Sequence, residues 1–214
     1  MDTIVWILIL LTAFNFLLKQ TFWKPVAVGA AAGIAAIFVI LMWPYAIEQS
    51  KTQIADWLSD NQLMLDTSVV LTLEIVLQMA FCLLAVHVAN YSPVKKRMML
   101  AYRLLYWFPG VLIIPVLFFG LTQAVFSFPG VSFKLIAWFF GAFVFVIIPL
   151  GRWLIKWLLP EEDLRLELFF LTNALVAILG IIATVNGRTA VEGVGVVDWS
   201  ALTGCVVLFL VGAI

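Results

Sequence analysis

The sequence contains very little charge. Only 11% of its 214 residues are Asp, Glu, Lys or Arg, and 65% are hydrophobic, whereas soluble domains are about 25% charged and about 45–50% apolar. The shortage extends along the whole chain, which excludes a soluble protein with a single anchor and predicts one transmembrane domain over residues 1–214. The formal net charge is zero, so nothing indicates nucleic acid as a partner. The expected partners are the lipid bilayer and another membrane-protein subunit.

Histidine and cysteine are equally scarce. The chain has one histidine, His87, and two cysteines, Cys82 and Cys205, which lie in apolar stretches without the spacing of a metal site. It contains no Gly-x-Ser-x-Gly, no His-Glu-x-x-His and no paired aspartates in an apolar stretch. We therefore expect no metal site and assign no catalytic residue, and these absences favour a non-enzymatic protein.

Long apolar stretches make up most of the chain. A membrane-spanning helix needs about 20 apolar residues. Seven stretches predict an all-α, polytopic membrane helix bundle of about seven transmembrane helices: 3–18, 26–47, 67–90, 104–126, 133–158, 160–185 and 199–214. Between the second and third, residues 48–66 carry apolar side chains at near-helical spacing, which predicts an amphipathic helix on the outer face of the membrane.

Proline and glycine predict local features of these spans. Pro115 should kink the fourth span because it removes a backbone hydrogen bond. Pro149 and Gly151 should interrupt the last third of the fifth. Gly29 and Gly33 leave one face of the second span without side chains, and we expect that face to pack inside the bundle rather than in a dimer.

The distribution of basic residues predicts an orientation. Nine lie in the first, third and fifth connections and three in the others. The nine are Lys19, Lys24, Lys95, Lys96, Arg97, Arg103, Arg152, Lys156 and Arg165. Because cytoplasmic loops carry the excess of basic residues, the N-terminus is expected outside and the C-terminus in the cytoplasm of a bacterial inner membrane. Lys19 and Lys24 follow the first apolar run, which predicts a retained span rather than a cleaved signal peptide.

Polar residues inside the third span form the candidate site. Glu74 and Gln78 lie one helical turn apart on the same face. A carboxylate among apolar side chains must face a partner or water, and two interpretations remain open. Glu74 either handles protons or cations, or it forms a structural hydrogen bond to a neighbouring helix through Thr172 or Asn173.

His87 lies nearer the end of the same span, on the opposite side from Gln78. A lone histidine can be an axial ligand for haem, with a methionine (Met79, Met98 or Met99) as the second ligand. It can equally be an ordinary residue at the membrane interface. Haem is the one cofactor that the sequence suggests.

The stretch FFLTNALVAILGIIATVNGRTAVEGVGVVDW, residues 169–199, ends a seven-span chain that resembles the small membrane protein of Bacteroidetes-type haem-uptake operons. In those operons the protein accompanies an ExbB/TolQ-like proton-channel subunit and a cobaltochelatase-like protein. The resemblance extends over most of the chain and concerns its overall pattern of apolar spans. It carries over no functional residue. It implies a role in haem or metal-nutrient uptake within a complex.

Three functional hypotheses follow. The first is a non-enzymatic subunit of an inner-membrane transport or energy-transducing complex. The second is a self-sufficient small transporter, in which Glu74 couples transport to protons or cations. The third is a haem-binding membrane redox protein that uses His87 as a ligand.

Overall fold

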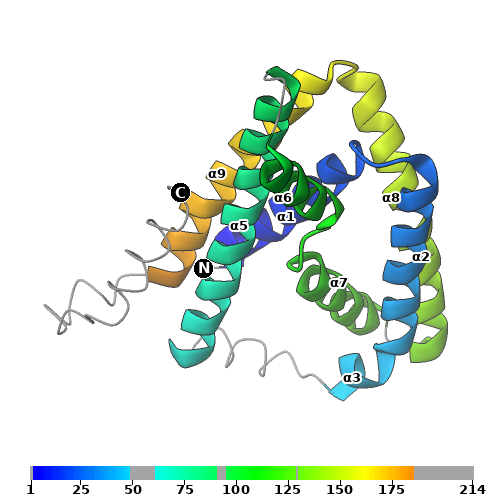
Figure 1. Ribbon diagram of the computed structural model, residues 1–214. Coiled ribbons are helices and arrows are strands. Elements are labelled where there is room, and N and C mark those ends of the chain that lie inside the picture. Colours follow the sequence, from blue (N-terminus) through cyan, green and yellow to red (C-terminus); the bar gives the residue numbers. More distant parts are fainter. Residues whose placement is uncertain (1, 49–60, 91–94, 129, 186–214) are drawn as a thin grey trace, which may run out of the picture. The chain divides into compact units, whose positions relative to one another are not determined.

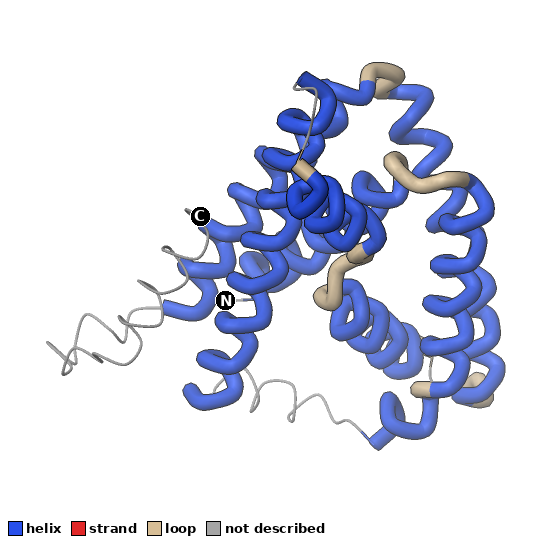
Figure 2. Tube along the Cα trace, viewed as in Figure 1, coloured by secondary structure: helices blue, strands red, loops and turns tan. Residues whose placement is uncertain are grey.

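The computed structural model describes residues 2–48, 61–90, 95–128 and 130–185, and every regular element in these ranges is a helix (Figures 1 and 2). The chain divides into two compact units, 1–184 and 185–214, and the description below concerns the first. The expected all-α fold is confirmed for these residues. In chain order the helices are α1 (Asp2–Gln20), α2 (Pro25–Leu41), α3 (Trp43–Glu48), α5 (Asn61–Asn90), α6 (Lys96–Trp107), α7 (Ile113–Ser127), α8 (Phe133–Leu158) and α9 (Glu162–Val185).

Three helices are long and apolar enough to cross a membrane: α5 over Ser68–Asn90, α8 over its full length and α9 over Glu162–Ile182. Helices α1, α2 and α7 are apolar but shorter. The count of seven spans and the orientation of the termini therefore stay predictions. The seventh expected span, 199–214, lies outside the described residues, as do residues 49–60 of the expected amphipathic connection, while residues 61–66 begin α5.

The expected fourth span is wrong as a single helix. α6 ends at Trp107 and α7 begins at Ile113, so residues 108–112 form a break. Pro109 cannot donate a backbone hydrogen bond, and Gly110 has a φ of 98°, which no helical residue adopts. Pro115 kinks nothing, because it lies in the first turn of α7, where backbone N–H groups have no helical partner.

Two further expectations need correction. The second span is not continuous: α2 ends at Leu41 and α3 follows after Met42, because Pro44 has no N–H to donate to the preceding turn. In contrast, α8 continues through Pro149 and Gly151 to its end. One proline inside a long helix with a packed face removes a single bond without ending the helix.

α2 packs along α8 (Figure 1). A Cβ atom at Gly141 of α8 would lie 2.8 Å from Cγ1 of Ile40, so the helices are in close contact. The buried face of α2 consists of Val28, Ala32, Ala35, Ala36 and Val39. Gly29 and Gly33 lie on another face, and no atom of the described chain would lie within 4 Å of a Cβ at either. The expectation that the glycine face packs inside is therefore wrong for the described residues, because the alanine face takes that place.

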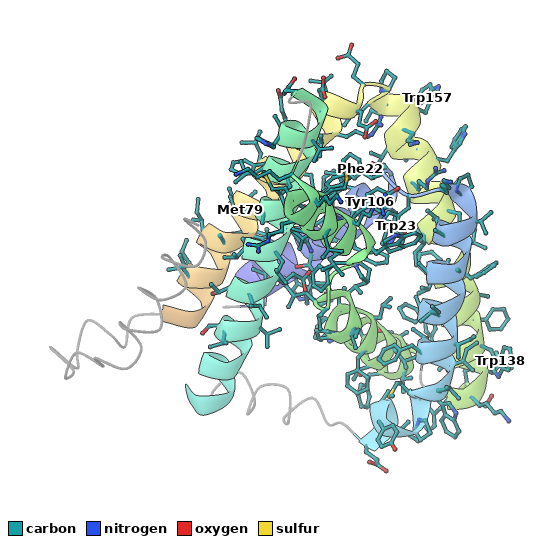
Figure 3. The ribbon with its side chains drawn as sticks, viewed as in Figure 1. Phe22, Trp23, Met79, Tyr106, Trp138 and Trp157 are labelled. Carbon is teal, nitrogen blue, oxygen red and sulfur yellow. The ribbon has the colours of Figure 1, made fainter. Side chains whose placement is uncertain are left out.

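α5 packs against α9, and α9 also contacts α1. Phe81 and Phe169 meet edge to face in one buried cluster, and Leu71 and Val176 share another. Side chains on the outer face of α8 include exposed tryptophans at both ends of the helix, such as Trp138 and Trp157 (Figure 3). Such an arrangement is typical of a helix whose ends lie at the two membrane–water interfaces.

Candidate functional site at the break between α6 and α7

The break leaves backbone groups without helical partners. A helix ends with carbonyl groups that accept no intrahelical bond and begins with N–H groups that donate none. At the end of α6 the deficit is larger, because the carbonyl of Leu105 would normally accept from residue 109, which is proline. These groups lie among apolar helices, where an unpaired backbone group costs several kcal/mol. Two buried side chains from other helices supply the missing partners.

Glu74 of α5 satisfies the start of α7. Its Oε2 accepts hydrogen bonds from the backbone N–H groups of Val111 and Leu112, both at 2.6 Å. Its Oε1 accepts from Nε2 of Gln78 at 2.8 Å. The side chain is 5% exposed. A carboxylate at this position also complements the positive end of the α7 dipole, so it holds the start of α7 against α5.

Lys19 of α1 satisfies the end of α6. Its Nζ donates to the carbonyl of Leu105 at 3.0 Å and lies 2.9 Å from the ring centroid of Phe81. The residue is 1% exposed and forms no ion pair with any described residue. The ring face and the negative end of the α6 dipole are the two features around Nζ that favour the charged ammonium over the neutral amine.

The connection between α1 and α2 completes the contact with α6. Nε1 of Trp23 donates to the carbonyl of Tyr106 at 2.7 Å, and the Tyr106 hydroxyl donates to the carbonyl of Phe22 at 2.6 Å. Trp23 also meets the ring of Trp107, the last residue of α6, with centroids 5.6 Å apart, and Figure 3 shows Phe22 and Trp23 next to Tyr106. Burial raises the pKa of Tyr106, so the hydroxyl keeps its proton and remains a donor. Arg152 of α8 also donates to the carbonyl of Trp23, at 3.0 Å.

The two halves of the broken helix are thus held by two buried ionisable side chains, one basic and one acidic. Lys19 lies at the carbonyl end of α6 and Glu74 at the N–H end of α7, each from a different helix. Oε1 of Gln78 is buried and has no hydrogen-bond partner. A protonated Glu74 would carry an O–H, and this unused oxygen could accept it after the Gln78 amide rotates. The hydrogen bond between Glu74 and Gln78 can therefore form in both charge states of Glu74.

The structure brings together only some of the residues singled out in the sequence. Glu74 and Gln78 are paired as expected from their spacing. Asn173 is not with them: its Nδ2 donates to the carbonyl of Phe169 in its own helix. Thr172 instead bonds to Asn15 of α1. The suggested bond from Glu74 to either residue is therefore wrong, since its partners come from the break and from Gln78.

His87 is half-buried on α5, away from the break. Met79 lies on the same helix about 12 Å along its axis and packs against Leu71, Ile75 and Val176. The structure therefore does not bring His87 and Met79 together as a pair of ligands, because both project from one helix and Met79 is packed in this cluster. No group of three or more His, Cys, Asp or Glu side chains that could hold a metal ion occurs in the described residues.

Sequence reasoning misses the roles of Lys19 and Trp23 and the position of the break. Lys19 follows an apolar run, so the sequence places it in a connection, and the excess of basic residues places that connection in the cytoplasm. The Pro109-Gly110 pair is the available signal for the break, since this dipeptide marks turns. Nothing in the sequence assigns Lys19 to the carbonyl that Pro109 leaves unpaired, because the two residues come together only in the fold.

The fold and the site define an α-helical protein of the membrane class, with three candidate spans in the described residues and two buried ionisable side chains, Lys19 and Glu74, at a helix break. No family model, curated protein or solved structure matches the chain.

Proposed function

We propose that the protein is a non-enzymatic component of an inner-membrane transport system, and that the break between α6 and α7 is its proton- or cation-responsive element. The observation that supports this proposal is the capping of the break by Glu74 and Lys19. Membrane transporters form ion and substrate sites at interrupted helices, whose free ends interact with charge. Ionisable residues within membrane helices are costly and commonly mark such sites.

Protonation of Glu74 would change the contact with α7. The carboxylate attracts the N–H groups of Val111 and Leu112 and the positive end of the helix dipole. The neutral acid keeps weaker hydrogen bonds and loses the charge interaction. Gln78 can follow this change by rotating its amide to present Oε1. Proton binding would then loosen the start of α7 while the hydrogen bond between Glu74 and Gln78 is kept.

The setting of this element is a complex with another membrane subunit. The open glycine face of α2, around Gly29 and Gly33, supports this setting, since membrane helices associate through small residues. The resemblance to the haem-uptake operon protein suggests haem or another metal nutrient as the cargo and an ExbB/TolQ-like proton channel as the partner. A self-sufficient small transporter is the second candidate, because the same break would serve it.

The test uses Glu74→Gln, which keeps the size of the side chain and an acceptor oxygen but cannot exchange a proton. Its matched control is Glu167→Gln, at an exposed position on α9. We expect Glu74→Gln to lower haem-dependent growth or uptake at least tenfold while helix content and detergent monodispersity stay normal. Wild-type activity in this variant would assign Glu74 to structure alone.

A second measurement distinguishes a subunit of a complex from a self-sufficient transporter. The protein is purified in mild detergent from native membranes, and its partners are identified by mass spectrometry. Copurification with a proton-channel subunit supports the complex. A monomer that transports on its own in liposomes would instead establish the self-sufficient transporter.

A further inference from the structure

The exposed face of α6 has an unusual composition. At 100° per residue, six side chains of α6 fall within one sector of the helix: Lys96, Arg97, Leu100, Arg103, Leu104 and Trp107. All six are exposed, whereas Tyr102, Leu105 and Tyr106 on the other side pack against the rest of the protein. The exposed face is therefore half cationic and half apolar. We call these six residues the outer face of α6.

The cations of this face form no ion pair within the described part of the protein. The helix carries three basic residues and no acidic one, and Lys95 adds a fourth cation just before it. None of the four forms an ion pair or a side-chain hydrogen bond with another described residue. Three of them lie at the helix N-terminus, where the dipole is itself positive and repels them. An anionic ligand would relieve this repulsion.

The apolar residues specify what kind of anion fits. Leu100, Leu104 and Trp107 are 61%, 67% and 60% exposed and lie mainly toward the C-terminal half of the face. A soluble anion would cover the cations and leave this stripe in water. A phospholipid offers an anionic headgroup beside acyl chains, and tryptophan favours the boundary between the two. Basic amphipathic helices bind anionic membrane surfaces in this way.

We infer that the outer face of α6 binds anionic phospholipid, with Arg97 and Arg103 at the headgroups and Leu104 and Trp107 toward the acyl chains. This inference does not depend on the proposed transport function. It does connect the lipid to the break, because the C-terminal carbonyls of Leu105 and Tyr106 are the ones that Lys19 and Trp23 hold.

The test measures lipid retained by the full-length protein in native mass spectrometry, after exposure to micelles containing phosphatidylglycerol or phosphatidylcholine. The test variant is Arg97→Gln/Arg103→Gln. The control is Lys24→Gln/Lys134→Gln, which removes the same charge from two other exposed positions. Neither pair of side chains makes a described hydrogen bond, so both variants should fold, and circular dichroism checks this.

The wild type and the control should retain phosphatidylglycerol in preference to phosphatidylcholine. In the test variant the ratio of retained phosphatidylglycerol to phosphatidylcholine should fall about fivefold for each cation removed. In the wild type, added salt should lower the same ratio. Equal retention of the two lipids by the wild type would overturn the inference. So would an unchanged preference in the test variant, or a dimer that depends on Arg97 and Arg103, which would make a second copy the occupant.

Discussion

Glu74 and Gly110 lie so close that no side chain fits between them. A Cβ atom at Gly110 would lie 2.6 Å from Oε1 of Glu74 and 3.0 Å from Nε2 of Gln78. Gly110 also has a φ of 98°, a conformation that costs other residues about 1–2 kcal/mol. Glycine is thus required at the break for two separate reasons, its backbone conformation and the approach of the carboxylate.

Gly110→Ala should therefore destabilise the protein more than Gly130→Ala. Gly130 has nearly the same φ, 97°, but open space around it in the described chain, so its replacement has only the conformational cost. We expect Gly110→Ala to cost about 2 kcal/mol more, since overpacking typically costs about 1–3 kcal/mol. Thermal or denaturant unfolding in detergent measures both variants. Equal losses would show that the carboxylate does not approach Gly110.

Lys19 and Phe81 should be energetically coupled. The Lys19 ammonium lies over the Phe81 ring, and no described carboxylate pairs with it. Phe81→Leu should cost more in the wild type than in Lys19→Met, because only the charged side chain loses a partner. A double-mutant cycle should give a coupling of about 2 kcal/mol, the value for a desolvated cation–π contact. A coupling near zero would contradict the geometry.

The sequence predicts the helical class and the polar face of α5 well, because both depend on local patterns. The bounds expected for the fifth span, 133–158, coincide with those of α8. The pairing of Glu74 with Gln78 follows from a spacing of four residues on one helix. The partners of Glu74 at Val111 and Leu112, in contrast, are 37 and 38 residues away. Only the packing of the helices brings these residues together.

The predictions that were wrong depended on contacts between helices, which local sequence patterns do not determine. Pro115 and Pro109 are equally visible in the sequence, yet one lies in the first turn of a helix and the other follows the end of one. Lys19 looks like any basic residue after an apolar run, but residues of α5, α6 and α9 surround its ammonium group. The face of α2 that packs inside depends on which side α8 approaches, and α2 offers small residues on two faces.

Tyr106 should make stability depend on pH in the alkaline range. Burial raises its pKa, so the protonated hydroxyl stabilises the fold below about pH 10, the ordinary value. This contribution is lost as the pH rises through the raised pKa of the folded state. Tyr106→Phe should lower stability by about 1 kcal/mol at pH 7, and the difference from the wild type should shrink above pH 10. Unfolding at both pH values, with exposed Tyr45→Phe as the control, measures this effect, and a difference that is constant with pH would contradict it.

Thr172 should contribute more to stability than Thr122, although both are buried in apolar helices. Thr122 donates its hydroxyl proton to a carbonyl of its own helix, at 2.9 Å. The Thr172 hydroxyl has such a carbonyl at 2.8 Å, but its single proton can instead be donated to Oδ1 of Asn15, which lies on α1. Thr172→Val leaves that buried amide without its partner, at a cost of about 1–3 kcal/mol, while Thr122→Val should cost less. Equal effects in denaturant unfolding would show that the α1–α9 bond contributes nothing.

Gly33 and Gly141 should respond to substitution in opposite ways. Gly141 faces Ile40 of α2, so Gly141→Leu should prevent the close contact of α2 with α8 and destabilise the protein by several kcal/mol. Gly33 is surrounded by open space in the described chain, between the exposed residues Val26 and Ile37. Gly33→Leu should therefore leave the unfolding transition of the purified protein unchanged, or raise it slightly, since leucine favours a helix more than glycine does.

The same variant tests what the open face of α2 does in the membrane. If α2 contacts a partner subunit through this face, leucine at position 33 prevents the close approach that small residues allow. Copurification of the partner from native membranes should then fall, while the level of correctly folded protein stays the same. Lower stability of the purified Gly33→Leu protein would show that the face is covered within the chain. Unchanged copurification with unchanged stability would place the partner on a different helix.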